Sequence, residues 1–509
     1  MGQQNSSRRD FLKTAGAGAF ALAAPAVIGA GRTDRRPNIL FCLSDDQSYP
    51  HAGAYGCGMT STPAFDRVAG EGVLFSNAYV NVPSCCPSRA TALTGQPFYR
   101  LKEGSQNWAG GLRKSYATYT GLLAEQGYAV GSTGKGMAPT GKAKNSGRMQ
   151  KTPAGRRYNK RKTKPPAKGM SSVDYAANFR DFLGDRKDGQ PFCFWFGATE
   201  PHRAYEEGSG LRAGKKLAEA EVPGFLPDID PVRKDVLDYA LEIEWFDTHL
   251  QRMMDMLEEA GELENTLILV TGDNGMPFPR AKTTMYDSGT RVPLAVRWGD
   301  RVPGGRTVDD FVSFIDFAPT FVEAAGGTPP EQMLGSSLVP LLTSRESGRV
   351  EPERDHVLAG RERHHPGAES FPARAIRTDR YLYIRNYKPG HSWGGRMRGE
   401  FDPGEYDDYR DVDPCISKRV MLQPKNRRRF HHLYQMAFGP RPAEEFYDVQ
   451  ADPHQLHNLA PIPGHEQVMR RLRRRLRREL KETGDPRALG RGEVFDEYFN
   501  KEWLQQRFG

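Results

Sequence analysis

The sequence predicts an α/β fold with a largely parallel central sheet, followed by a smaller C-terminal α+β subdomain with a short antiparallel sheet. Over most of the chain, apolar runs typical of buried strands alternate with segments of helical periodicity. Polar residues follow the end of each predicted strand, where parallel sheets commonly place their sites. After about residue 345, short paired strands replace this alternation.

The expected elements follow one another in the order that such a fold requires. Apolar runs with polar ends predict strands within 36–47 (RPNILFCLSDDQ), 190–202 (QPFCFWFGATEPH) and 265–275 (NTLILVTGDNG). The stretch 123–136 predicts a helix end, a turn, a strand and a loop, and 236–262 has apolar residues at helical spacing.

A second pattern marks the C-terminal part, and we place the boundary between a catalytic domain, 31–355, and a subdomain, 356–509. Paired short strands are expected within 373–390, and a strand, a turn and a helix start within 444–460. A basic helix (EQVMRRLRRRLRREL) follows, and its apolar stripe is predicted to pack on the body; the stripe consists of Met469, Leu472, Leu476 and Leu480.

The first 30 residues are predicted to be an export signal and not part of the fold. Arg8 and Arg9 precede a short run rich in alanine and glycine that ends in small residues, as in a twin-arginine signal. The run is too short and too rich in glycine for a stable membrane anchor. We therefore expect the twin-arginine translocase as a partner, folding before export, and a periplasmic or secreted location in a bacterium.

Composition restricts the class of partner only weakly. The net charge of +9 indicates an anionic partner or serves solubility, and no nucleic acid is expected. Six scattered cysteines indicate no dense disulfide framework. A basic insertion, 141–169, is interpreted either as a solvated segment or as a basic lip that gathers a polyanionic substrate.

The stretch 82–95, VPSCCPSRATALTG, carries the first chemical motif. Pro87 suits the first turn of a helix, so Cys85 is expected at a helix N-terminus, where backbone amides attract anions. From the residues alone, Cys85 is either a thiolate nucleophile or an incidental buried cysteine.

Four oxygen donors at strand ends predict a cation site. They are Asp45, Asp46, Asp273 and Asn274. This donor set suits Ca²⁺ or Mg²⁺ and does not suit zinc.

From about residue 36 to about residue 460 the chain resembles the type I sulfatases of the alkaline-phosphatase superfamily, because CCPSR fits Cys-x-Pro-Ser-Arg from Cys85 and TALTG follows. The resemblance implies an α/β/α sandwich and the conversion of Cys85 to formylglycine by a formylglycine-generating or radical maturation enzyme. Cys86 is then only the variable position. The hydrated aldehyde is a geminal diol that attacks sulfur and later releases sulfate by returning to the aldehyde.

The resemblance also assigns roles to matching residues. It implies one Ca²⁺, with Mg²⁺ as the alternative, held by the four oxygen donors together with the modified Cys85. Arg89 would hold the formylglycine, Lys135 and Lys282 would contact sulfate, and His202 would bind a sulfate oxygen or protonate the leaving group.

One position departs from the family pattern. Most members have Thr-Gly-Lys-x-His where this chain has TGKGM, so Met137 stands in place of a histidine that helps to deprotonate the diol. A thioether cannot accept that proton, so either another residue substitutes, with His51 as the candidate, or the step that releases sulfate is slow.

The motifs EPHR, VPGFLPD and DNGMPFPRAKTTMYDSGT resemble the heparan N-sulfatase branch, which implies a sulfated glycan as substrate. Whether the enzyme is an O-sulfatase or an N-sulfatase stays open. Arg363, His364 and His365 would contact the substrate or form only a polar loop. Two other classes stay open, a phosphomonoester or phosphonate-ester hydrolase and a non-catalytic sulfated-glycan-binding protein with an unmodified Cys85.

Overall fold

Eight strands form the central sheet of the computed structural model, which describes residues 35–137, 145–366, 368–392 and 409–508. In spatial order they are β5 (Arg156–Arg157), β4 (Ala129–Gly134), β6 (Phe192–Gly197), β1 (Asn38–Ser44), β7 (Thr266–Gly272), β8 (Leu294–Arg297), β2 (Val73–Phe75) and β9 (Arg306–Val308). Neighbouring strands from β5 to β7 run parallel, whereas β8 is antiparallel to both of its neighbours. The predicted largely parallel sheet is confirmed.

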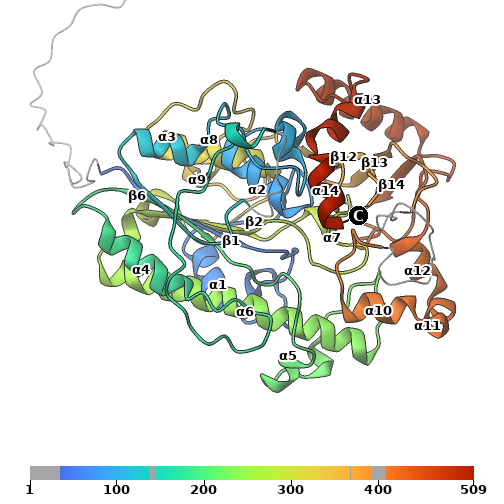
Figure 1. Cartoon of the computed structure of the whole chain (residues 1–509), viewed down its shortest axis with the longest axis horizontal. Coiled ribbons are helices and arrows are strands. Elements are labelled where there is room, and N and C mark those ends of the chain that lie inside the picture. The colour runs from blue at the N-terminus through green and yellow to red at the C-terminus, as the bar shows by residue number, and fades with distance from the viewer. Residues whose placement is uncertain (1–34, 138–144, 367, 393–408, 509) are drawn as a thin grey trace, which may run out of the picture. The chain divides into compact units, whose positions relative to one another are not determined.

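Helices cover both faces of this sheet, which makes the fold an α/β/α sandwich (Figure 1). One face packs against α1 (Pro63–Gly70), α4 (Tyr175–Asp185) and α6 (Asp230–Glu259), and the other against α2 (Cys85–Thr94), α3 (Tyr119–Glu125), α8 (Phe317–Ala324) and α9 (Val339–Thr343). Strand β1 shows why both faces are covered. Ile39 and Phe41 belong to one apolar cluster and Leu40 and Cys42 to the other, because successive side chains point to opposite faces.

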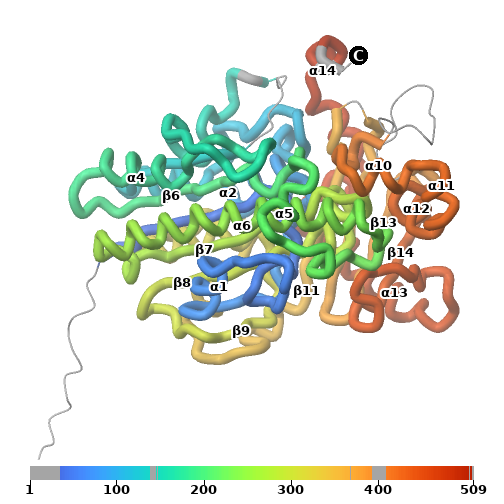
Figure 2. Tube along the Cα trace, turned by 90° about the horizontal axis from the view of Figure 1, so that it is seen from below, coloured from blue at the N-terminus to red at the C-terminus, as the bar shows by residue number. Residues whose placement is uncertain are grey.

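The C-terminal part contains a separate antiparallel sheet, as predicted. Its strands, in order, are β11 (His356–Arg361), β12 (Ala373–Thr378), β13 (Tyr381–Asn386) and β14 (Glu444–Asp448). Around it lie α10 (Ile416–Leu422), α11 (Pro424–Arg429), α12 (His431–Phe438), α13 (Glu466–Glu482) and α14 (Lys501–Phe508). Figure 2 shows α10 to α13 gathered beside β13 and β14.

The basic helix α13 packs by the predicted stripe. All four stripe residues are buried, in a cluster with Val82, Phe98 and Ile376. The helix begins at Glu466, later than the helix start expected within 444–460. A chain turn at 449–465 separates it from β14.

The remaining short elements are α5 (Ser209–Arg212), α7 (Asp287–Thr290) and a two-stranded parallel sheet of β3 (Ala78–Tyr79) and β10 (Val312–Ser313). Within the basic insertion, β5 adds an edge strand to the central sheet, and Met149 and Ala167 are buried. The predicted export signal lies outside the described residues. Among the described residues no helix has the length and apolar character needed to cross a membrane. The described residues from Arg36 onward form one compact unit, and the boundary at residue 355 stays a prediction.

Buried ion pairs tie the C-terminal segment to the antiparallel sheet. Arg374 on β12 is 0% exposed and donates to Asp485 (2.7 Å) and to Glu362 (2.8 Å). We expect Arg374→Met to lower the free energy of unfolding by about 3–5 kcal/mol, because it leaves the buried Asp485 carboxylate without its cation and removes one of the two arginines that pair with Glu362. Denaturant unfolding followed by circular dichroism measures this change.

The matched control is Arg380→Met, which removes an arginine whose side chain is 58% exposed and whose ion pair with Asp448 is 2.8 Å long. An exposed pair contributes only about 0–1 kcal/mol. Equal destabilisation by the two substitutions would show that burial of the Arg374 network does not matter.

Candidate active site

Two neighbouring parallel strands end in the acidic residues of the site. Asp45 and Asp46 follow β1, and Asp273 and Asn274 follow β7, with Ser44 beside Gly272 in the register. The backbone N–H of Asp46 donates to Asp273 Oδ1 (2.9 Å), and Asn274 Nδ2 donates to Asp46 Oδ1 (2.7 Å). Asp46 has φ 72°, a left-handed conformation that non-glycine residues seldom adopt outside functional sites.

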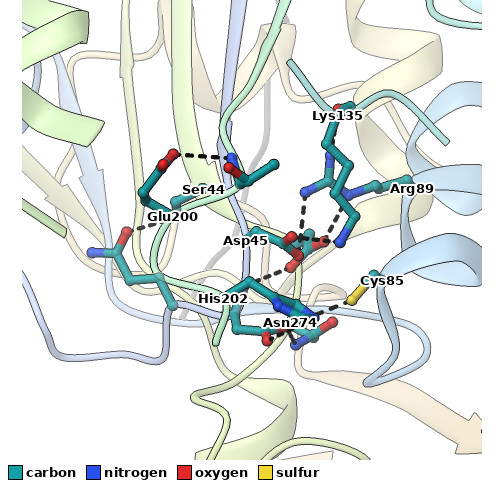
Figure 3. A network of polar contacts seen from close by, with 12 residues as sticks. Ser44, Asp45, Cys85, Arg89, Lys135, Glu200, His202 and Asn274 are labelled. Atoms are coloured by element: carbon teal, nitrogen blue, oxygen red, sulfur yellow. Dashed lines mark hydrogen bonds and ion pairs between the residues drawn. The ribbon is translucent and has the colours of Figure 1, made fainter. Parts of the chain in front are cut away.

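Cys85 is the first residue of α2, as the motif predicts, and it points toward these acids (Figure 3). Its Sγ lies 3.6 Å from Asp46 Oδ1, and the residue is 2% exposed. Burial raises the pKa of the Cys85 thiol well above its usual value, and nearby Asp45 and Asp46 act in the same direction against Lys135 and Lys282. A protonated thiol is a weak nucleophile, so the site does not favour an unmodified thiolate.

Three cations surround the acids. Arg89, on the same helix as Cys85, donates to Asp273 Oδ2 (2.7 Å) and to the Lys135 carbonyl (2.6 Å). The Lys135 ammonium pairs with Asp45, and Lys282 Nζ lies 2.7 Å from Asp46 Oδ2. The structure therefore brings together Arg89, Lys135 and Lys282 around one acidic cluster.

His202 is the most exposed member of the group, with 35% of its side chain accessible. Its Nδ1 lies 2.6 Å from the Arg203 carbonyl, which makes Nδ1 the protonated nitrogen of the neutral ring. Its Nε2 lies 3.9 Å from Asp46 Oδ2. Nε2 is thus the nitrogen that faces the acidic cluster.

The Met137 side chain supplies no base to the site. Met137 is 7% exposed and packs in the apolar cluster on the α2 face of the sheet. His51 Nδ1 is 3.0 Å from the Tyr239 hydroxyl, and His51 lines a cavity together with Glu221 and His454. Burial lowers the pKa of His51 to about 4. No contact between His51 and Cys85 occurs among the described residues, and its role as base stays a prediction.

Of the three predicted substrate residues after β11, His364 lies beside the catalytic helix. Its Nδ1 is 2.7 Å from Ser84 Oγ and 3.0 Å from Asn107 Nδ2, and burial lowers its pKa to about 3. The backbone N–H of His365 donates to Asp411 (2.9 Å). Arg363 instead pairs with Asp496 (2.9 Å), a residue near the C-terminus.

Sequence reasoning missed Asp413. Its Oδ2 lies 3.0 Å from Lys282 Nζ, and it forms a second potential metal group with Asp46 and His202. The acidic run DDYRDVDP, which contains Asp413, was the only signal, and nothing in it specifies a contact with the lysine.

The acidic cluster fits a divalent cation. One ligand atom each from Asp45, Asp46, Cys85 and Asp273 lies within 4.8 Å of the others, and all four residues are buried. Asp45 Oδ1 and Asn274 Oδ1 are buried without a hydrogen-bond donor. Buried oxygens without donors are costly unless another ligand satisfies them, and carboxylate and amide oxygens are the donors that Ca²⁺ and Mg²⁺ prefer.

The formal charges of the site also favour a bound divalent cation. Four carboxylates, those of the three cluster aspartates and Asp413, face the three cations Arg89, Lys135 and Lys282, so the formal sum is −1. Burial acts to raise the pKa of Asp45, but Lys135 and Arg89 outweigh it and hold that pKa well below its usual value. A sulfate ester carries one negative charge, so a divalent cation would change the site from repelling to attracting it.

Comparison with known proteins supplies the family. The model of the sulfatase family matches residues 37–327, and the model of the N-sulphoglucosamine sulphohydrolase C-terminal region matches residues 280–423. The first match covers β1 through α8 and contains every predicted catalytic and metal-binding residue.

Relatives and solved structures agree with this assignment. An ulvan-active sulfatase of Formosa agariphila is 27% identical over 91% of this chain and 78% of its own length. Human N-sulphoglucosamine sulphohydrolase is 27% identical over 92% of this chain and 95% of its own. The structure of BT4656 in complex with D-glucosamine-2-N,6-O-disulfate has 19% identity and a TM-score of 0.63, covering 89% of this chain and 99% of that one, and so shares the fold. The chain belongs to the sulfatase family and is a sulfuric ester hydrolase.

Proposed function

We propose that the enzyme hydrolyses sulfate esters or sulfamates of a sulfated carbohydrate, with Cys85 converted to formylglycine and a divalent cation held beside it. The observation that carries the proposal is the position of Cys85. It opens α2 with its side chain 3.6 Å from Asp46, among buried acids and cations. The cation would be held by Asp45, Asp46, Asp273 and Asn274, where it would lower the pKa of the hydrated aldehyde and screen the sulfate charge.

The cationic side chains and His202 would position the site, bind the sulfate and protonate the leaving group. Arg89 donates to Asp273 and to the Lys135 carbonyl, and these hydrogen bonds hold α2 against the end of β7 and the loop after β4. Lys135 and Lys282 present ammonium groups to the sulfate oxygens, because each is already aimed at an aspartate of the cluster. His202, at the exposed side, would protonate the leaving group through Nε2 in its imidazolium form, because in the neutral ring the one proton stays on Nδ1, where it is donated to the Arg203 carbonyl.

A sulfated carbohydrate is supported by the known relatives. One relative is named for ulvan and another for N-sulphoglucosamine, and one structural neighbour holds a glucosamine disulfate. Some relatives are named for O-linked sulfate and others for N-linked sulfate. We therefore propose only that the substrate is a sulfated carbohydrate, and both linkages should be tested.

Mass spectrometry of the peptide that contains Cys85 tests the modification. We expect the side chain to have lost its sulfur and gained an aldehyde oxygen, while Cys86 stays a thiol. Matched sulfate and phosphate esters of one alcohol then separate the sulfatase from a phosphomonoester or phosphonate-ester hydrolase. An intact Cys85 thiol in an active preparation would refute the formylglycine proposal.

We also propose that residues 1–30 direct export of the folded enzyme. The twin arginines Arg8 and Arg9 support this. Substituting both by lysine should retain the enzyme in the cytoplasm, which fractionation of expressing cells measures.

Met137 leads to a kinetic prediction. If no histidine replaces the family base, the release of sulfate limits turnover, and the alcohol product appears in a burst before the steady state. Met137→His should then raise steady-state turnover by about tenfold or more, since a well-placed base typically contributes ~10²–10⁴-fold. Stopped-flow and steady-state assays on one chromogenic sulfate ester measure both quantities.

The control is Met137→Gln, which is polar and of similar size but is not a base at neutral pH. Absence of a burst in the parent, together with no gain from Met137→His, would contradict the prediction. A burst that appears only in His51→Ala would instead identify His51 as the base.

A further inference from the structure

A cavity outside the catalytic cluster lies between α13, β13 and the segment 487–490, and it has a volume of about 830 Å³. Five cationic side chains line it, namely Arg385, Arg473, Arg477, Lys481 and Arg487, against the single carboxylate of Glu444. It shares no residue with the catalytic cluster. We propose that this cavity and the adjoining face of α13 form a second binding site for the sulfated polysaccharide, which holds the polymer while its sulfate groups are removed elsewhere on the enzyme.

Helix α13 concentrates the excess charge of the chain. It contains seven arginines and one lysine against three glutamates, a formal +5 of the chain's +9. Three of these arginines form ion pairs, Arg473 with Glu444, Arg475 with Asp355 and Arg478 with Glu479. The other five cations are exposed and form no ion pair within the described part of the chain; they are Arg470, Arg471, Arg474, Arg477 and Lys481.

Four of these unpaired cations lie on one stripe of the helix. Arg470, Arg474, Arg477 and Lys481 follow one another at steps of four, three and four residues, which places them on one face over about 16 Å. Like charges at this spacing repel each other and weaken an isolated helix. The apolar stripe and the ion pairs of Arg473 and Arg475 attach α13 to the body, and none of the four cations in the row forms an ion pair within the described residues, so the row serves another purpose than packing.

Hydrogen bonds and ion pairs hold the arginines at the floor of the cavity. The Glu444 carboxylate accepts from Arg473 (2.7 and 2.6 Å) and from the Tyr383 hydroxyl. Arg487 is held by Glu362 (2.6 Å) and lies over the half-buried ring of Tyr387, with its Cζ 5.5 Å from the ring centroid. Fixed guanidinium groups bind anions with little loss of side-chain entropy, while Arg477 and Lys481 stay free at the rim.

The lining favours a sulfated glycan over a nucleic acid. A single-stranded nucleic acid requires several exposed aromatic rings on which successive bases stack. Here Tyr383 is buried, and Tyr387 alone offers a partly exposed ring, enough apolar surface for one sugar. Repeated sulfate groups along a sugar chain match a row of cations at successive turns of the helix. This choice of ligand rests on the proposed function.

Binding of labelled heparin, a sulfated polysaccharide, to the full chain carrying Cys85→Ala tests the site without turnover. Adding Arg477→Glu and Lys481→Glu should weaken binding by at least about tenfold at about 0.05 M salt, and added salt should reduce the difference because it screens the charges. Fluorescence anisotropy measures the affinity, and thermal unfolding verifies that the variant is folded.

The matched control is Lys425→Glu with Arg428→Glu, on α11. It changes the net charge equally, at two exposed cations that form no ion pair with any described residue, and α11 lies well apart from α13 in Figure 1. It should retain heparin affinity within about twofold. Equal weakening by both double variants would reduce the effect to net charge and overturn the proposal, as would unchanged binding in the α13 variant.

Desulfated heparin and single-stranded DNA of similar length complete the experiment. Binding of either as tightly as heparin would overturn the assignment to sulfated glycans. Failure of the proposed function would be seen in another measurement. The enzyme with intact Cys85 would release no sulfate from any sugar, whereas the heparin affinities of the Cys85→Ala proteins would not change.

Discussion

Replacing Cys85 by alanine is expected to abolish sulfate ester hydrolysis, with a loss of at least about 10⁴-fold in kcat. The methyl group of alanine cannot be converted to an aldehyde, so the nucleophile is lost while the acids and cations around it stay in place. The change removes one buried sulfur from a site held by other contacts. We therefore expect unfolding to shift by no more than about 1 kcal/mol. Steady-state kinetics on a chromogenic sulfate ester and thermal unfolding measure the two quantities.

Cys86→Ala is the matched control, because Cys86 is the next residue on the same helix and is equally buried. Its side chain packs in the apolar cluster on the α2 face of the sheet and contacts none of the acids among the described residues. It should keep turnover within a few-fold of the parent. Parent-like activity in a folded Cys85→Ala protein would refute the formylglycine proposal.

Much of the catalytic cluster could be predicted from the sequence because its residues stand at fixed places in regular elements. Asp45 follows a strand with seven buried residues, and Cys85 opens a helix that Pro87 helps to begin. Since parallel strands end at one edge of the sheet, residues after β1, β4, β6 and β7 must lie near one another. The pattern of apolar runs therefore predicted both the fold and the meeting of Asp45 with Asp273.

The contacts that the sequence could not predict come from loops and from the C-terminal part. Asp413 reaches Lys282 from a segment without periodicity, across more than a hundred residues. His364 lies against Ser84 and Asn107 because β11 ends beside α2, and no pattern in either segment specifies that packing. No strand was predicted at β8, and its antiparallel direction could not be predicted either, since a short buried strand has the same apolar pattern in either direction.

The same limit applies to α13. Its apolar stripe predicted correctly that the helix packs on the body, because burial follows from periodicity. The cavity beside it depends on Arg385 and Arg487, which belong to other segments and meet the helix only in the folded chain. A run of arginines in a helix usually forms only a solvated face. The cavity beside α13 is the feature that indicates a binding site here.

Removal of divalent cations is expected to abolish activity, and Ca²⁺ or Mg²⁺ should restore it. Without the cation, Asp45 Oδ1 and Asn274 Oδ1 lack a hydrogen-bond donor among the described residues, and the formal charge of the site repels a sulfate ester. The cation should also stabilise the folded enzyme, because the site exists only in the native state. At a concentration one hundred times the dissociation constant this linkage amounts to about 2.7 kcal/mol. Denaturant unfolding of the chelator-treated protein, with and without added Ca²⁺, measures that stabilisation independently of turnover.

Asp45→Asn should lose most of this stabilisation, since it replaces a carboxylate of the cluster by a neutral group of the same shape and leaves Lys135 without its ion pair. Asp310→Asn is the matched control. Asp310 is also fully buried, but it accepts hydrogen bonds from the backbone N–H groups of Val350 and Glu351 (both 2.7 Å) and lies outside the acidic cluster. Its loss should lower the stability of the protein with and without Ca²⁺ alike and leave the response to the cation intact. A chelator-treated enzyme that keeps full activity, or an Asp45→Asn variant that Ca²⁺ stabilises as strongly as the parent, would show that these oxygens do not hold the cation.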